Sequence, residues 1–198
     1  EFLRGFGGEG EMHHLVFTQN LVEQVEAFRR AECVWVGFPL YTDAMPGLVK
    51  TFLEELAPLK GRGENPPIGF LVQSGFPEGL HSRYVERYLA QLAERLGSPY
   101  LGTIVKGNGE GTRIMPAEMN KALFENLGAL GKGLRDDGQL DGEVLQAIAR
   151  PERFPQVLGP VFKVFLRTKI AHRYFDSMLV ENNAFQQRFA RPLLEIEQ

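Results

Sequence analysis

The stretch CVWVGFPLYTDAMPGLVKTFLEEL, residues 33–56, decides the fold. It opens with Cys33–Phe38, an almost unbroken apolar run that is typical of a parallel strand covered on both faces. A short polar loop, Pro39–Met45, comes next. Pro46–Ala57 then predicts a helix with proline in its first turn and leucine and phenylalanine on one side. The stretch is therefore a strand–loop–helix unit of an α/β protein.

The same unit recurs along the chain. The predicted strands are His13–Phe17, Cys33–Phe38, Ile68–Val72 and Tyr100–Val105. The predicted helices are Asn20–Ala31, Pro46–Ala57, Leu80–Leu96 and Pro116–Leu134. Strands and helices that alternate at this spacing predict a doubly wound parallel sheet with helices on both faces. Ligands bind such sheets where the strands end, so the loops of interest are Pro39–Met45, Gln73–Gly79 and Lys106–Met115.

Composition excludes several classes of protein. The 198 residues carry 22 Lys and Arg against 25 Asp and Glu, a net charge of −3, so no basic field is present to hold nucleic acid. The single cysteine, Cys33, excludes an internal disulfide and any multi-cysteine metal site, and it is predicted to be an inert core residue. No apolar run is long enough to span a membrane, and the first residues do not form a signal peptide. We therefore predict a cytoplasmic protein.

A helical extension follows the α/β pattern. Arg150–Pro155 is a proline-flanked linker, which predicts an α/β domain at 1–149 and a helical C-terminal extension at 150–198. Pro160–Leu179 and Asn183–Leu194 are predicted helices, and the first mixes aromatic and aliphatic residues with lysine and arginine. This helix would pack on the body or on a second subunit, or lie as a basic amphipathic helix on a membrane.

Three further motifs lack the context that their chemistry needs. Gly5–Gly10 matches GxGxxG, but it follows a helix end and precedes an apolar run, so it is better explained as a turn than as a dinucleotide site. Ser74 lies between a strand and a helix, yet Val72 stands where a hydrolase elbow needs glycine. His13 and His14 are adjacent in a predicted strand, so they point to opposite faces and cannot share a metal. We expect no metal site, and a hydrolase acting through Ser74 is only a minor alternative.

Two segments carry a resemblance to a known family. Gly37–Glu54 is similar to the flavodoxin-like NAD(P)H-dependent FMN reductases in its Pro-x-Tyr, its Pro-Gly and its Leu-Val-Lys-x-Phe-Leu-Glu. Gly69–Gly79, GFLVQSGFPEG, resembles the next flavin-contacting loop of that family. The resemblance covers Phe2 to Val105, and Asn183–Pro192 is similar to the tails of some long members. It implies a three-layer α/β/α fold, FMN as cofactor, NAD(P)H as co-substrate, and a flavin, quinone or similar small molecule as acceptor. It also implies a homodimer.

The resemblance places the flavin ring beside the first two loops. It implies that the cofactor-binding residues are Pro39, Leu40, Tyr41, Thr42, Asp43, Ala44, Met45, Gln73, Ser74, Gly75, Phe76 and Gly79. Gly107, Asn108 and Gly109 would border the substrate side. A flat ring needs a slot that backbone can approach closely, which glycines and short loops allow, and aromatic side chains can stack on it. Since the flavin carries the redox chemistry, no catalytic side chain is expected.

The chain departs from the family pattern at its start. The family opens with a strand and a phosphate-binding loop, whereas Glu1–Phe6 predicts the last turns of the following helix. We therefore predict a flavodoxin-like sheet that lacks its first, central strand here, and upstream residues in the natural protein. The strands at His13–Phe17 and Cys33–Phe38 would then lie about 9–10 Å apart, two strand spacings, instead of pairing directly. A non-catalytic flavodoxin-like binding module that uses the tail to hold a partner is the alternative function.

Overall fold

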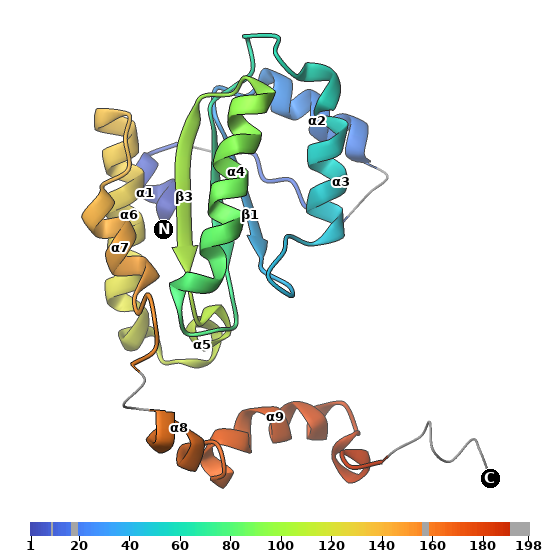
Figure 1. Ribbon diagram of the computed structural model, residues 1–198, viewed down its shortest axis with the longest axis vertical. Helices are drawn as coiled ribbons and strands as arrows, with labels where there is room; N and C mark the ends of the chain where they lie inside the picture. Colours follow the sequence, from blue (N-terminus) through green and yellow to red (C-terminus); the bar gives the residue numbers. More distant parts are fainter. Residues whose placement is uncertain (9, 17–19, 156–158, 191–198) are drawn as a thin grey trace, which may run out of the picture. The chain divides into compact units, whose positions relative to one another are not determined.

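The computed structural model describes residues 1–8, 10–16, 20–155 and 159–190. The chain divides into two compact units, Glu1–Arg153 and Phe154–Gln198. The first unit holds a three-stranded sheet with helices around it, and the second holds helices α8 and α9 (Figure 1). The predicted α/β fold with a parallel sheet is confirmed.

The sheet consists of three parallel strands that end level with one another. They are β1 (Val34–Pro39), β2 (Ile68–Gln73) and β3 (Tyr100–Lys106), in the order β1-β2-β3. The register places Gln73 between Pro39 and Lys106, so the last residues of all three strands are neighbours. The loops that follow the strands therefore leave the sheet from one edge.

Each face of the sheet buries its own hydrophobic cluster. One cluster takes alternate strand residues, such as Val36 and Phe70, and packs them against α2 (Leu21–Arg30), α3 (Gly47–Glu55) and α4 (Arg83–Leu96). The other takes intervening positions, such as Leu71, and packs them against α1 (Phe2–Phe6), α6 (Lys121–Asp137) and α7 (Gly142–Ala149). Both faces of the strands are thus removed from water, as their continuous apolar runs predict.

Local signals set most helix ends. α4 ends at Gly97 and α6 at Gly138, each glycine in the left-handed conformation that closes a helix. Asp141 caps α7, because its side chain accepts hydrogen bonds from the amides of Glu143 and Val144 at the start of that helix. Short helical turns fill the remaining connections: η2 (Ala57–Leu59), η3 (Gly79–Ser82), α5 (Gly109–Ile114) and η4 (Ala117–Asn120). The predicted loop Lys106–Met115 is therefore wrong over α5.

Glycines allow α1 to lie directly against α6. A Cβ on Gly5 would be 2.0 Å from the carbonyl oxygen of Gly128, and one on Gly131 would be 2.1 Å from that of Phe2. No larger side chain fits at either position, so the backbones of the two helices touch. This close crossing fixes the N-terminal helix on the second cluster.

The predicted strand at His13–Phe17 is wrong over its described part. Residues 13–16 contain a turn and no strand, and Phe17 lies outside the described residues. The carbonyl of His14 accepts a hydrogen bond from the Gln24 side chain, and Leu15 packs against the first cluster. In this apolar run, a side chain therefore bonds the His14 carbonyl and Leu15 is packed without a neighbouring strand.

The edge of β1 away from β2 has no partner strand among the residues that the structure describes. The amides of Val34 and Leu40 donate toward the β2 side, so the intervening Trp35 and Gly37 present their backbone groups to the other edge. Gly37 is exposed there. Because residues 13–16 form no strand, the expected distance of two strand spacings between His13–Phe17 and Cys33–Phe38 does not apply. That the sheet lacks a first, central strand here stays a prediction.

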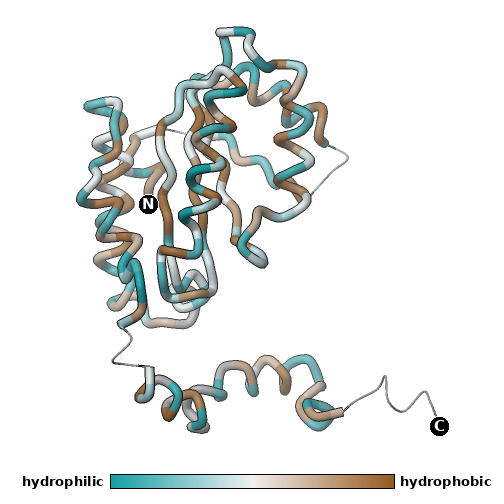
Figure 2. Tube along the Cα trace, viewed as in Figure 1, coloured by the Kyte–Doolittle hydropathy of each residue, from teal (hydrophilic) through white to brown (hydrophobic). Residues whose placement is uncertain are grey.

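The second unit is helical over its described residues. It contains α8 (Gly159–Phe165), α9 (Lys169–Glu181) and the short η6 (Phe185–Gln187). The predicted helix Pro160–Leu179 is interrupted by a turn at Leu166–Thr168, and only η6 forms within the described part of the predicted helix Asn183–Leu194. Figure 2 shows hydrophobic and hydrophilic residues interspersed along α8 and α9. No helix in the described ranges is long and apolar enough to cross a membrane.

Candidate functional site at the carboxyl edge of the sheet

The loop after β1 makes a tight turn with a strained backbone. The Tyr41 and Ala44 backbones exchange two hydrogen bonds, of 2.9 and 3.0 Å, across Thr42 and Asp43. Thr42 has a φ of 49° and Asp43 a φ of 59°, the pair of left-handed conformations that a two-residue hairpin turn needs. Glycine and asparagine are the usual residues here, and a β-branched threonine is rare. The turn holds the Tyr41 side chain 64% exposed at the sheet edge.

The loops after β2 and β3 are joined through their backbones. The Ser74 amide donates to the carbonyl of Lys106, and the amides of Asn108 and Gly109 donate to the carbonyls of Phe76 and Ser74, at 2.7 and 2.8 Å. The three residues predicted to border the substrate, Gly107, Asn108 and Gly109, therefore pack against the second loop. The amides of Asn108 and Gly109 are used within the protein.

Ser74 does not have the geometry of a nucleophile. Ser74 is only 3% exposed, and its hydroxyl donates to the carbonyl of Phe76. A hydrolase needs an accessible serine hydroxyl with a base beside it. This arrangement argues against the minor hypothesis of a hydrolase.

His81 links the first two loops. Its ring stacks on Phe76, with 4.1 Å between ring centroids and 23° between planes. Nδ1 lies 3.8 Å from a carboxylate oxygen of Asp43 in the first loop, and Nε2 lies 3.4 Å from one of Glu78 in the second. The role of His81 as a link could not be found from spacing, because Asp43 is far away along the chain.

The predicted flavin-contacting residues divide into an exposed and an inward set. The exposed residues are Tyr41, Thr42, Asp43, Ala44, Gln73, Gly75 and Phe76, and the buried ones are Leu40, Ser74 and Gly79, with Pro39 and Met45 intermediate. Phe76 is 50% exposed, and a Cβ on Gly75 would meet no heavy atom within 4 Å. An open surface with two aromatic side chains and one unhindered glycine thus follows β1 and β2. A planar ring is the kind of group that such a surface accommodates.

A lysine ends the third strand beside these loops. The Lys106 ammonium is half-buried and donates to the carbonyl of Gly107. Burial lowers the pKa of Lys106 from its ordinary value, because the charged form loses water. Lys106 places a cationic group at the carboxyl edge of the sheet.

The base of the second loop is fixed by the end of the first unit. The amides of Gly79 and Leu80 donate to the carbonyls of Pro151 and Glu152. Arg83 binds the Glu152 carboxylate at 2.7 Å, and the pKa of Glu152 is lowered mainly by this hydrogen bond. A cavity bordered by Arg83, Gln146, Arg150 and Glu152 lies beside this contact. These bonds anchor the end of the second loop to the last residues of the first unit.

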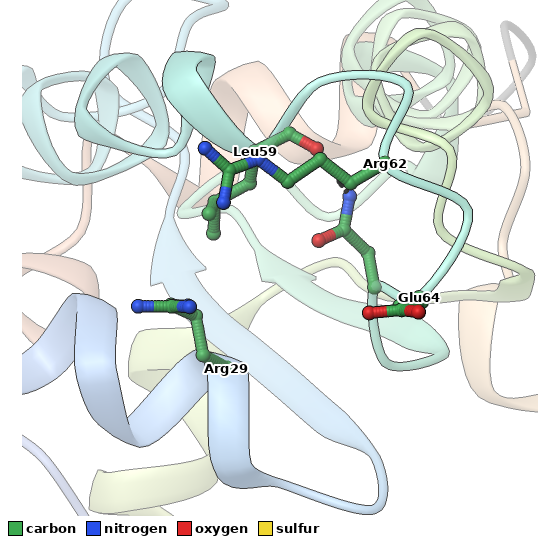
Figure 3. A pocket seen from close by; sticks show the side chains of 5 residues that line it. Arg29, Leu59, Arg62 and Glu64 are labelled. Carbon is green, nitrogen blue, oxygen red and sulfur yellow. Dashed lines mark hydrogen bonds between the residues drawn. The ribbon is translucent and has the colours of Figure 1, made fainter.

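A second cavity lies at the amino ends of the strands (Figure 3). Arg29, Leu59, Arg62, Glu64 and Asn65 line it. Asn65 donates to the carbonyls of Leu59 and Leu96, and Arg29 pairs with Glu26 in the last turns of α2. The Asn65 hydrogen bonds satisfy carbonyls at helix ends, and Arg29 places a cation at the C-terminus of α2, where positive charge is favoured. Neither this cavity nor the first is lined by residues of Pro39–Met45 or Gln73–Gly79.

The described residues contain no group of three His, Cys, Asp or Glu side chains that could hold a metal ion. Cys33 is a free thiol at the start of β1. Its pKa is raised, chiefly by burial, so the thiol stays protonated and weakly nucleophilic.

No protein-family model and no curated protein matches the chain. Among solved structures, it is similar to the apo form of an NADH:FMN oxidoreductase, with a TM-score of 0.52 and 16% identity over 79% of this chain and 87% of that one. The chain has the fold of that oxidoreductase. At this identity the likeness shows the fold alone, and it supports the flavodoxin-like architecture that the sequence predicts.

Two other solved structures are less similar. An NADPH-quinone reductase from P. pentosaceus has a TM-score of 0.46 and 13% identity over 63% of this chain and 78% of that one. An FMN-dependent NADH-azoreductase from Bacillus anthracis, solved with FMN, has a TM-score of 0.43 and 14% identity over 67% of this chain and 70% of that one. Neither adds to what the first structure shows about the fold.

Proposed function

We propose that the protein binds FMN at the carboxyl edge of its sheet and transfers a hydride from NAD(P)H, through the flavin, to a flavin, quinone or similar acceptor. One observation carries this proposal. The loops after β1 and β2 meet through Asp43, His81 and Phe76, and together they present an open, aromatic surface where ligands bind in doubly wound sheets. The fold neighbour named as an NADH:FMN oxidoreductase is consistent with it.

The exposed residues fit a flavin ring better than a compact substrate. Tyr41 and Phe76 offer aromatic faces, and Gly75 leaves room for a ring to approach the backbone. The Lys106 ammonium would favour negative charge on the bound group. The flavin, when bound, supplies the hydride chemistry, so the side chains serve to position it and to exclude water. The proposal includes no catalytic side chain.

Homodimer formation belongs to the same proposal. Tyr84 and Tyr88 are exposed on α4, and Arg87 lies 4.6 Å above the Tyr84 ring. Tyrosine and arginine are enriched at protein–protein interfaces, which supports this surface as a subunit contact. Light scattering of the purified protein, compared with a Tyr88→Glu variant, tests it, and a monomeric mass for both would refute it.

An absorbance spectrum tests the cofactor. The purified natural protein, supplied with FMN and freed of excess, should show flavin bands near roughly 370 and 450 nm, and NADH or NADPH should bleach the second band anaerobically. Comparing the two nicotinamides gives the preferred donor. A protein that retains no flavin would refute the proposal and favour the alternative, a non-catalytic binding module. A flavin that is bound but not reduced by either nicotinamide would refute the reaction alone.

A further inference from the structure

Charge is divided unevenly between the two units. Glu1–Arg153 contains 16 Lys and Arg and 21 Asp and Glu, a net charge of −5. In contrast, residues 159–175, which form α8 and the first half of α9, contain Lys163, Arg167, Lys169 and Arg173 and no acidic residue. Asp176 and Glu181 follow in α9, so residues 159–181 carry four cations and two acidic residues, a net charge of +2, which is opposite in sign to that of the first unit. This positive charge calls for an anionic neighbour.

The same helices expose apolar side chains. Val161 and Val164 on α8 are 66% and 65% exposed, and Leu166 in the turn after α8 is also exposed. Met178 and Val180 are likewise exposed on α9. Figure 2 shows that hydrophobic and hydrophilic residues alternate along this part of the chain. Exposed aliphatic residues beside lysine and arginine are typical of helices that lie in a lipid headgroup region.

We propose that α8 and α9, residues 159–181, dock on an anionic lipid surface and make the protein a peripheral membrane protein. The cations are attracted to acidic headgroups, and the aliphatic side chains enter the boundary between headgroups and acyl chains. Charge decides between the possible occupants. A zwitterionic surface attracts these cations less than an anionic one does, and a second copy of this net-positive segment would repel them.

Co-sedimentation with vesicles tests the proposal and does not depend on flavin. The full chain should sediment with phosphatidylcholine vesicles that contain roughly 30% phosphatidylserine, and much less with phosphatidylcholine alone. Each Lys or Arg near an anionic surface contributes about a fivefold factor to partitioning, so Lys163→Gln with Arg167→Gln should weaken binding about 25-fold. Val161→Ser with Val164→Ser should also weaken it, and this loss should persist in high salt, where charge attraction is screened.

A matched control separates location from total charge. Lys60→Gln with Lys132→Gln removes the same charge from exposed positions of the first unit and should leave vesicle binding within about twofold of the wild type. Equal weakening by both pairs would overturn the proposal, because net charge alone would then explain it. Equal sedimentation with both vesicle types, or with neither, would also overturn it. The proposal would also be overturned if the variant with Lys163→Gln and Arg167→Gln lost its dimeric mass but still bound vesicles. A second copy of the chain would then cover the helices.

Discussion

Alanine at Gly107 and at Gly75 makes the same chemical change in two neighbouring loops, with opposite expected results. A Cβ on Gly107 would lie 2.5 Å from the carbonyl oxygen of Pro77 and 3.0 Å from that of Phe76. A Cβ on Gly75 would meet no heavy atom within 4 Å. We expect Gly107→Ala to destabilise the fold, and Gly75→Ala to weaken FMN binding without destabilising it.

The size of the first effect follows from the overlap. Ordinary contacts begin near 3.4 Å, so the Pro77 carbonyl must move by about 0.9 Å, and overpacking of this kind costs about 1–3 kcal/mol. The movement also disturbs the 2.7 Å hydrogen bond from the Asn108 amide to Phe76, worth about 0.5–1.5 kcal/mol. Together these predict a loss of about 2–4 kcal/mol in the free energy of unfolding. Gly75 has no positive φ, so alanine there should change stability by less than about 1 kcal/mol.

Two assays separate the effects. Urea unfolding can be followed by the fluorescence of Trp35, the single tryptophan, whose ring lies 4.5 Å from that of Phe2. Quenching of FMN fluorescence gives the dissociation constant of the cofactor. A stability loss below about 0.5 kcal/mol in Gly107→Ala would refute the packing argument. An unchanged FMN dissociation constant in Gly75→Ala would show that the ring does not approach this glycine.

Three further predictions concern the turn, the clamp and the sheet edge. Thr42→Gly should raise the free energy of unfolding by about 1 kcal/mol, since glycine adopts a φ of 49° without strain; an unchanged urea midpoint would contradict this. Arg83→Met should lower the free energy of unfolding at pH 7, measured in urea, by less than about 1 kcal/mol, because the pair is partly exposed. Arg83 holds the pKa of Glu152 below its usual 4.5, so the stabilisation by this pair should be lost as the pH falls through the lowered pKa. Equal urea midpoints of the variant and the wild type at pH 7 would contradict this prediction. In hydrogen exchange of residues 1–198, the Gly37 amide should exchange faster than that of Val36, and equal protection would show that the β1 edge is covered.

Sequence reasoning predicted the elements whose signals are local. The three long apolar runs form β1, β2 and β3, because buried parallel strands need apolar residues at successive positions. The cap at Asp141 and the glycine at the end of α4 are also local, since each depends on only a few neighbouring residues. The run at His13–Val16 was misjudged for the same reason. A short apolar segment does not reveal whether a strand or a side chain such as Gln24 will satisfy its backbone.

The geometry of the site depended on contacts that spacing cannot give. Asp43 and His81 lie in different loops, and only the parallel pairing of β1 with β2 brings them to 3.8 Å. Gly107 is predicted to border the substrate side, and the structure shows that the Pro77 backbone lies against it, which leaves no room for a larger side chain. A glycine in a sequence signals close approach but not the identity of what approaches.

The strained turn is the strongest physical reason to place function at this edge. Two consecutive non-glycine residues with positive φ, Thr42 and Asp43, cost stability that a glycine would recover. The strain is held by two backbone hydrogen bonds between Tyr41 and Ala44, and the Asp43 carboxylate lies 3.8 Å from the His81 ring of the second loop. Three separate restraints on one exposed turn do little for a fold whose core is made by the sheet and its helices. They do fix the position of the exposed Tyr41 side chain, as the ring-binding surface proposed above requires.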